Sequence, residues 1–151
     1  MHEKWMAEAL AEAEKAAQMG EVPVGAVIVF ENEIIARGRN EMRTRQDPTH
    51  HAEMQAIQRA ATHLGYYRLL GCDLYVTLEP CAMCAGAMVL ARIRHCYYGT
   101  SDPKTGACQS LMNIPQDERL NHRVELTAGV LAEACRAQLQ QFFQQIRHKN
   151  G

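Results

Sequence analysis

The sequence has no hydrophobic run that approaches the length needed to cross a bilayer, about 20 consecutive apolar residues. Its N-terminus also lacks the apolar core of a secretion signal, because Glu3, Lys4, Glu8 and Glu12 interrupt the alanines there. Together these absences predict a cytoplasmic protein with no membrane segment.

The sequence has almost no net charge, with 16 Lys and Arg against 17 Asp and Glu. Proteins that bind nucleic acids often have a basic excess, so the total by itself favours no such partner. The distribution is less even, because Arg37, Arg39, Arg43 and Arg45 fall close together with Glu41 as the single acid among them. This pattern predicts a local basic patch in spite of the near-neutral total.

Repeats, linkers and low-complexity segments are also missing from the chain. With 151 residues, 47% hydrophobic and 22% charged, the composition is ordinary for a soluble globular protein. A chain of this length buries roughly two thirds of its unfolded surface, which is enough for one core. We therefore expect residues 1–151 to form a single domain.

Six cysteines could in principle form three disulfides. In a reducing compartment, a chain with enough apolar residues for its own core has little need of them. Four of the six are expected to be small buried apolar residues: Cys72, Cys96, Cys108 and Cys135. The other two, Cys81 and Cys84, have a spacing that suggests a different use.

Hydrophobic periodicity predicts helices alternating with strands. The expected helices cover residues 2–19, 49–64, 81–91 and 130–147, the second opened by Asp47-Pro48-Thr49 as a cap. The expected strands cover residues 24–30, 34–39, 73–77, 95–99 and 124–126, with a short helical turn near 110–113 in the long loop between the last two. Such an order predicts an α/β sandwich.

Cys81 and Cys84 are three residues apart, so both can lie on one face of a helix's first turn. His51 can supply a third ligand, and three such ligands without a fourth are typical of a catalytic zinc site, which leaves one position for water. Because both segments are expected to enter helices, the positive helix ends would favour the thiolates that bind metal. Neither the cysteine pair nor the histidine alone is specific for a zinc site, but the combination of the two is.

Glu53, two residues after His51, is a candidate for moving protons at that water. On an ideal helix its side chain would point about 200° away from that of His51, which disfavours both binding one metal. The helix must therefore begin irregularly, or Glu53 must reach in from another direction. The neighbouring His50 lacks this spacing to Glu53, so it is expected to lie behind the site or on the surface.

The arrangement H-x-E followed by P-C-x-x-C is the signature of the zinc-dependent nucleobase deaminases. The chain resembles the bacterial tRNA-specific adenosine deaminases over nearly its full length. Beyond the metal motif, the matching stretches are residues 21–27, 47–49, 74–79, 84–88, 102–107 and 121–125.

The resemblance implies a three-layer α/β/α fold of the cytidine-deaminase type, with a mixed sheet of about five strands. It implies one Zn²⁺ per subunit on His51, Cys81 and Cys84, with Glu53 taking a proton from the activated water and returning it to the substrate. The implied reaction converts the wobble adenosine of a tRNA anticodon stem-loop to inosine.

The resemblance also implies substrate contacts. Asn40 and the backbone N–H of Ala52 would bind the base, and Val24 would form part of an apolar wall. Asp102, Lys104 and Phe143 are candidates for contacts with neighbouring nucleotides, and Arg147 and Lys149 for contacts with phosphates. From the residues alone, Phe143 fits a core position equally well, and Asn40 fits an ordinary turn.

Two other functions fit part of this pattern. A deaminase of a free nucleobase or nucleotide would share the metal site, but the arginine run and residues 102–107 disfavour it. A non-catalytic zinc-binding module is disfavoured by Glu53 and by the missing fourth ligand.

The helix expected at residues 81–91 is nearly all apolar, so it must be covered on every side. Either the first or last helix or a second copy of the chain could cover it. The resemblance to dimeric proteins favours a homodimer.

Overall fold

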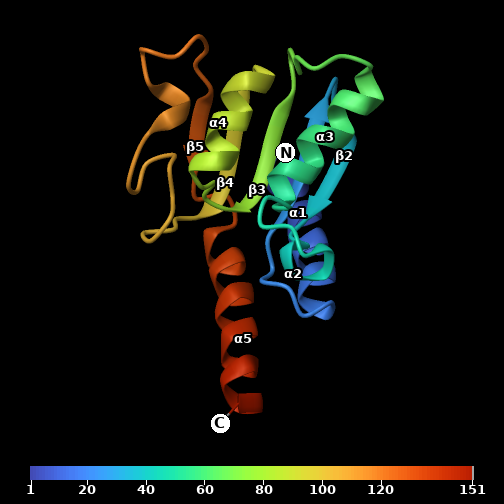
Figure 1. Ribbon diagram of the computed structural model, residues 1–151, viewed down its shortest axis with the longest axis vertical. Coiled ribbons are helices and arrows are strands. Elements are labelled where there is room, and N and C mark those ends of the chain that lie inside the picture. The colour runs from blue at the N-terminus through green and yellow to red at the C-terminus, as the bar shows by residue number, and fades with distance from the viewer. Residues whose placement is uncertain (151) are drawn as a thin grey trace.

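A five-stranded sheet forms the centre of the computed structural model, which describes residues 1–150 (Figure 1). The strand order is β2-β1-β3-β4-β5. Strand β1 runs antiparallel to both of its neighbours, whereas β3, β4 and β5 run parallel to one another. The strands are β1 (Gly25–Phe30), β2 (Glu33–Arg39), β3 (Asp73–Leu78), β4 (His95–Thr100) and β5 (Glu125–Ala128). The sheet is therefore mixed, as predicted.

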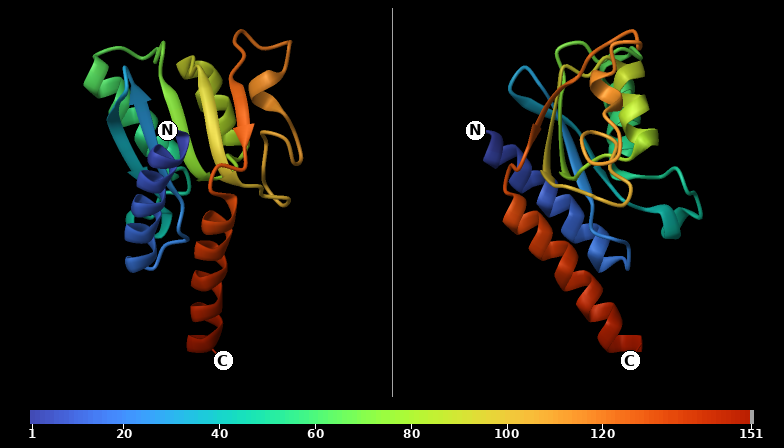
Figure 2. Two further views of the ribbon diagram at one scale, coloured as in Figure 1. Left: turned by 180° about the vertical axis from the view of Figure 1, so that it is seen from behind. Right: turned by 90° about the vertical axis from the view of Figure 1, so that its left-hand side faces the viewer.

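Helices cover both faces of this sheet (Figures 1 and 2). Helix α1 (His2–Gln18) packs on β1 and β3, and α5 (Ala132–Asn150) packs on β4 of the same face. Helices α3 (Ala52–Leu64) and α4 (Ala82–Ala91) cover the other face. The three-layer α/β/α prediction is confirmed. Within residues 1–150, every helix is too short or too polar to cross a membrane.

Strand β1 shows why the sheet has two cores. Its residues from Gly25 to Val29 are all buried, as expected for a central strand covered on both faces. Ala26 and Ile28 face the core under α3 and α4, while Val27 and Val29 face the core under α1. The alternation follows the two-residue period of a strand, so one continuous apolar run supplies both layers.

The loops that follow β3 and precede α3 meet at one end of the sheet. Strands β3 and β4 are parallel and joined by α4, so α4 begins where β3 ends. In Figure 1 the first turns of α3 and α4 lie side by side at this end, and α5 extends beyond it. The topology thus brings two helix N-termini, and the residues just before them, to one place.

The start of α3 differs from the prediction. Asp47-Pro48-Thr49 does not cap the helix, which begins at Ala52 with His51 as its N-cap. Asp47 instead accepts hydrogen bonds from the N–H and the hydroxyl of Thr49 and so closes a separate turn. The polar loop before it also contains a short helix, α2 (Met42–Arg45), which the sequence did not predict.

The long loop after β4 contains its helical turn four residues later than predicted. The 3₁₀-helix η1 spans Ile114–Gln116 and has Pro115 in its first turn, where proline's missing N–H costs nothing. The last strand, β5, lies at the edge of the sheet and begins and ends slightly later than expected.

Candidate active site

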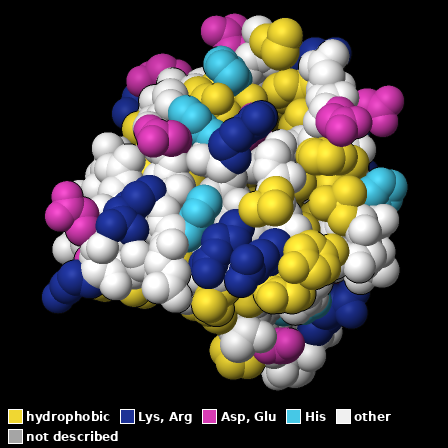
Figure 3. All heavy atoms as spheres, turned by 90° about the horizontal axis from the view of Figure 1, so that it is seen from above, with side chains coloured by type: hydrophobic (Ala, Val, Ile, Leu, Met, Phe, Trp, Pro, Cys, Tyr) yellow, Lys and Arg dark blue, Asp and Glu magenta, His cyan; other side chains and the backbone are white. Residues whose placement is uncertain are grey.

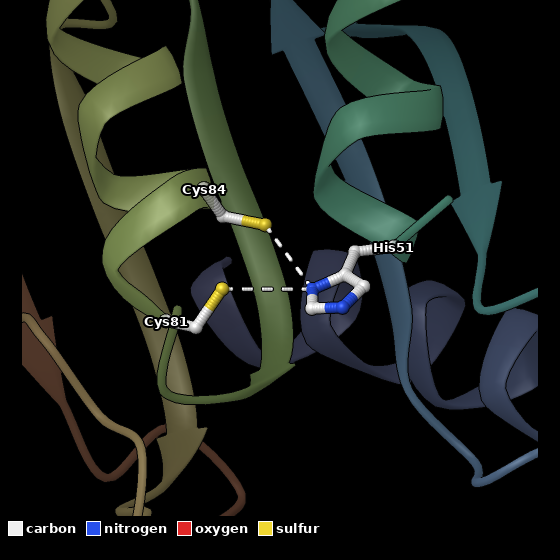
Figure 4. Close-up of side chains that lie close together, drawn as sticks. All are labelled: His51, Cys81 and Cys84. Atoms are coloured by element: carbon white, nitrogen blue, oxygen red, sulfur yellow. Dashed lines mark hydrogen bonds between the residues drawn. The ribbon is translucent and has the colours of Figure 1, made fainter. Parts of the chain in front are cut away.

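His51, Cys81 and Cys84 come together between the first turns of α3 and α4 (Figure 4). His51 and Cys81 are the residues just before the two helices, and both have an extended backbone. The Nδ1 atom of His51 lies 3.6 Å from the Sγ of Cys81 and 3.5 Å from the Sγ of Cys84. All three donor atoms lie within 4.8 Å of one another.

This donor set fits a zinc ion. With Zn–S bonds of about 2.3 Å and Zn–N bonds of about 2.0–2.1 Å, tetrahedral geometry separates a nitrogen from a sulfur ligand by about 3.6 Å. Both nitrogen–sulfur distances in the site are close to that value. Among the residues that the structure describes, no fourth histidine, cysteine or acid joins the group. The arrangement therefore matches a site with one position left for a non-protein ligand.

The hydrogen bonds within the group bias its protonation. The thiol of Cys84 donates to Cys81 and, together with the His51 ring, lowers the pKa of Cys81 to about 4. The same bond and burial raise the pKa of Cys84. The bond to Cys81 raises the pKa of His51, although burial opposes that rise. The lowered pKa of Cys81 favours its thiolate, the form that binds metal.

Glu53 lines the same pocket as His51 and Cys81. It lies in the first turn of α3 and is only 4% exposed. Because His51 is extended and not yet helical, the 200° separation of an ideal helix does not apply, and both side chains reach the pocket. Burial raises the pKa of the Glu53 carboxyl to about 7. Near neutral pH this group can both accept and release a proton.

A pocket of about 220 Å³ opens beside these residues, and its exposed lining is mostly apolar. Four of the predicted substrate residues line it, namely Val24, Asn40, Ala52 and Asp102. The sequence did not single out several others that also line it: Val22, Met42, Leu78, Glu79 and Thr105. These five residues come from four separate segments of the chain, and only the fold brings them together.

The side chain of Asn40 is held in one orientation at the pocket wall. Its Nδ2 donates to the carbonyl of Val22 at 3.2 Å, and its Oδ1 accepts the N–H of Met42 at 3.3 Å. One N–H of the amide and one lone pair of its oxygen stay available. Asn40 can therefore offer both a donor and an acceptor to a bound base.

Lys104 and Phe143 do not line this pocket. Lys104 is exposed on the turn that Asp102 begins. Phe143 is 42% exposed, so it is not a core residue, and with Arg136 and Arg147 it lines a separate hollow on α5. The side chain of Lys149 lies outside the described residues.

Glu79, at the end of β3, holds one wall of the pocket. Its buried carboxylate accepts hydrogen bonds from the Ser110 hydroxyl and from the backbone N–H groups of Asp102, Cys108, Gln109 and Ser110. Burial by itself raises the pKa of Glu79, but these bonds outweigh it and hold the pKa below its ordinary value. In the sequence Glu79 stands out only as the last residue of the matching stretch 74–79, and nothing nearby in the sequence indicates its hydrogen-bond partners.

Residues 1–147 match the family model of the MafB19-like deaminases. The chain is 51% identical over 147 residues to the tRNA-specific adenosine deaminase of Bacillus subtilis (strain 168), a match that covers 97% of this chain and 91% of that protein.

Two solved structures are similar to this one. One is described as "Biochemical and Structural Studies of A-to-I Editing by tRNA:A34 Deaminases at the Wobble Position of Transfer RNA"; it has a TM-score of 0.86 and 43% identity, covering 89% of this chain and 98% of that chain. The other, a guanine deaminase from Bacillus subtilis, has a TM-score of 0.64 and 42% identity, covering 67% of this chain and 65% of that chain. The similarity confirms the predicted deaminase fold.

Proposed function

The chain belongs to the tRNA-specific adenosine deaminases, within the MafB19-like deaminase family, and we propose that it hydrolyses the wobble adenosine of a tRNA anticodon to inosine. The single observation that carries this function is the grouping of His51, Cys81 and Cys84 beside a mostly apolar pocket that Glu53 also lines. In the net reaction the bond from C6 of the purine to its amino nitrogen breaks, the oxygen of water bonds to C6, and ammonia leaves.

His51, Cys81 and Cys84 would hold one zinc ion per subunit, since their types and spacing fit that metal. A zinc ion held there supplies Lewis acidity, which lowers the pKa of water from about 16 to about 7. The positive end of α4 favours the deprotonated form of Cys81, and the thiolate is the form of cysteine that binds metal.

Glu53 would carry the protons of the reaction. Its carboxylate would accept one proton from the attacking water and donate it to the purine ring nitrogen, and would then pass the second water proton, from the oxygen now bound to C6, to the departing amine. Burial raises the pKa of this carboxyl to about 7, which suits a group that must both accept and release protons. Its burial keeps bulk water from competing for that proton.

The pocket would receive an adenine base turned out of the anticodon loop, because RNA is read mainly where bases can be splayed out. Asn40 and the N–H of Ala52 would bind its polar edge, and Val24 would contact its ring. The hollow under Phe143 is also lined by Thr100 and Ser101, which lead directly into the Asp102 wall of the pocket.

The neighbouring nucleotides would therefore cross the turn that carries Asp102 and Lys104 and continue toward Phe143. Arg136 and Arg147 border the same hollow and supply positive charge for phosphates. We expect this route to explain how a nearly neutral chain binds RNA.

A second copy of the chain would cover the outer face of α4. Leu90 on this helix is 74% exposed, and Tyr66, Tyr67 and Leu70, in the connection from α3 to β3, are exposed as well. Figure 3, seen from the end where α3 and α4 finish, shows hydrophobic side chains gathered beside a group of Lys and Arg. The expected homodimer would be seen as twice the 17.0 kDa chain mass in light scattering, and Leu90→Glu should shift it toward the monomer.

One assay series tests the activity. The zinc-loaded protein is offered an anticodon stem-loop, free adenosine, cytidine and guanine, and inosine and ammonia are measured. We expect turnover of the stem-loop only. Turnover of a free base or nucleoside alone would instead support the second candidate function, a deaminase of free nucleobases or nucleotides. The similarity to a guanine deaminase favours that alternative. No turnover of any substrate would support a non-catalytic zinc-binding module.

A further inference from the structure

The two ends of one surface loop are fastened together beside the candidate active site. Residues 41–50, called the 41–50 loop, leave the sheet after Asn40 and return at His51. The N–H of Glu41 donates to the carbonyl of His50 at 3.1 Å, so the residues that enter and leave the loop are neighbours. We call this pair, Glu41 and His50, the neck of the loop. Asn40, at the pocket wall, precedes Glu41, and His51, in the metal-binding group, follows His50, so the two residues flank the neck.

Gln55 of α3 lies behind this neck and is only 2% exposed. Its Oε1 accepts the backbone N–H of Arg39 at 2.9 Å. Its Nε2 donates to the Glu41 carboxylate at 2.5 Å and to the Nε2 of His50 at 2.9 Å. A side-chain amide has two N–H groups to donate, and here both go to the neck of one loop.

Such an arrangement is more than a satisfied core residue requires. A buried amide costs free energy unless it is hydrogen-bonded, and an apolar side chain would fill the same place between α3 and β2 without that cost. The three partners of Gln55 all lie where the chain enters or leaves the loop: Arg39 and Glu41 at its start, and His50 at its end. The other anchor of the loop is Glu21, which binds the N–H groups of Arg43 and Thr44 near its tip.

We propose that Gln55 is a positioning residue for deamination, because its amide locks the neck of the 41–50 loop and thereby fixes Asn40 relative to His51. This inference rests on the proposed function. Asn40 would orient the base, and His51 would hold the ion at which the base reacts. A shift of about 1 Å between such groups can lower the rate by about 100-fold, even when the group that moved is not itself reactive.

The test uses Gln55→Met, which keeps the length of the side chain and the helix propensity but removes the hydrogen bonds. We expect kcat on the anticodon stem-loop to fall about tenfold or more, with KM within about threefold, because orientation is lost while the RNA contacts remain. Zinc content should equal that of the wild type. The matched control is Gln58→Leu on the exposed side of the same helix, which should behave like the wild type.

A double-mutant cycle tests whether Gln55 and Glu41 affect the rate through one shared hydrogen bond or through two independent contacts. Glu41→Ala removes the partner of the Gln55 amide, so the double variant should be no slower than the slower single variant, since both act through one neck. Additive losses in the cycle would overturn the proposal. Wild-type kcat and KM in Gln55→Met would also overturn it, as would a loss explained entirely by missing zinc.

Hydrogen–deuterium exchange tests the role of Gln55 in the loop without any measurement of activity. In Gln55→Met the N–H of Glu41 and its neighbours in the loop should exchange faster, while the middle of α3 keeps its protection. If the wild type fails to deaminate the stem-loop, the proposed function is wrong, yet the exchange experiment still measures the lock. Unchanged exchange in the loop would show that Gln55 does not fasten it.

Discussion

Gly38 of β2 lies directly against Ala52 of α3. A Cβ atom on Gly38 would lie 2.1 Å from the carbonyl oxygen of Ala52 and 2.8 Å from the backbone nitrogen of Ala56. Both obstacles are backbone atoms, which cannot swing aside as a side chain can. Because His51 immediately precedes Ala52, this approach of helix to strand also sets the position of a metal-binding candidate.

Replacing Gly38 with alanine should therefore disturb the fold and the site together. We expect Gly38→Ala to lower the free energy of unfolding by about 1–3 kcal/mol or more, as overpacking does, and to lower the zinc content of the purified protein. Gln58→Ala on the exposed side of α3 is the control, because its side chain faces away from the core and alanine is at least as good a helix former. Equal denaturation midpoints for the two variants would contradict the prediction.

Glu53 and Cys84 should separate catalysis from metal binding. Glu53→Gln removes the proton carrier but none of the three candidate ligands, so activity should fall about 100- to 10,000-fold with zinc retained. Cys84→Ala should lose both. Elemental analysis of the two variants, beside their rates on the stem-loop, checks the division. Zinc missing from the glutamine variant would show that the roles are not divided in this way.

Glu79 should matter for stability as well as for the pocket wall. In Glu79→Gln one acceptor oxygen becomes a donor that faces the backbone N–H groups of residues 102–110, so at least one buried group loses its partner. The expected cost is about 1–3 kcal/mol in chemical denaturation. Ser110→Ala removes a single hydroxyl donor and should cost less, about 0.5–1.5 kcal/mol. The reverse order of the two variants would contradict this account.

Glu21 should make the stability depend on pH on the acid side. Burial by itself raises its pKa, but hydrogen bonds from Thr44 and Arg43 outweigh it and hold the pKa below the ordinary value of 4.5. A carboxyl whose pKa is lower in the folded state stabilises that state above the unfolded value and loses the effect as the pH falls through the folded value.

The comparison for this prediction is Glu21→Gln. The difference in melting temperature between wild type and variant should be constant from about pH 7 to about pH 5 and should shrink below about pH 4.5. Other acids titrate in both proteins, so only the difference between the two curves reports on Glu21. A difference that stays constant into the acid range would show that the Glu21 charge contributes nothing.

Much of this protein can be derived from local sequence. The apolar run of β1, the spacing of Cys81 and Cys84, and the short distance from His51 to Glu53 are patterns within a few residues, where backbone periodicity and ligand chemistry act directly. The predicted strands and main helices accordingly appear close to their expected places, and the three ligand candidates meet as their spacing suggests.

The sequence by itself determined which groups we propose for the chemistry, because side-chain type and short-range spacing can be read from it directly. Only the tertiary structure decided how they face one another. The extended backbone of His51 let Glu53 share its pocket, and the partners of Glu79 and Gln55 lie where strands and loops distant in the chain are packed together. Such contacts depend on sheet register and helix placement, which no local pattern encodes.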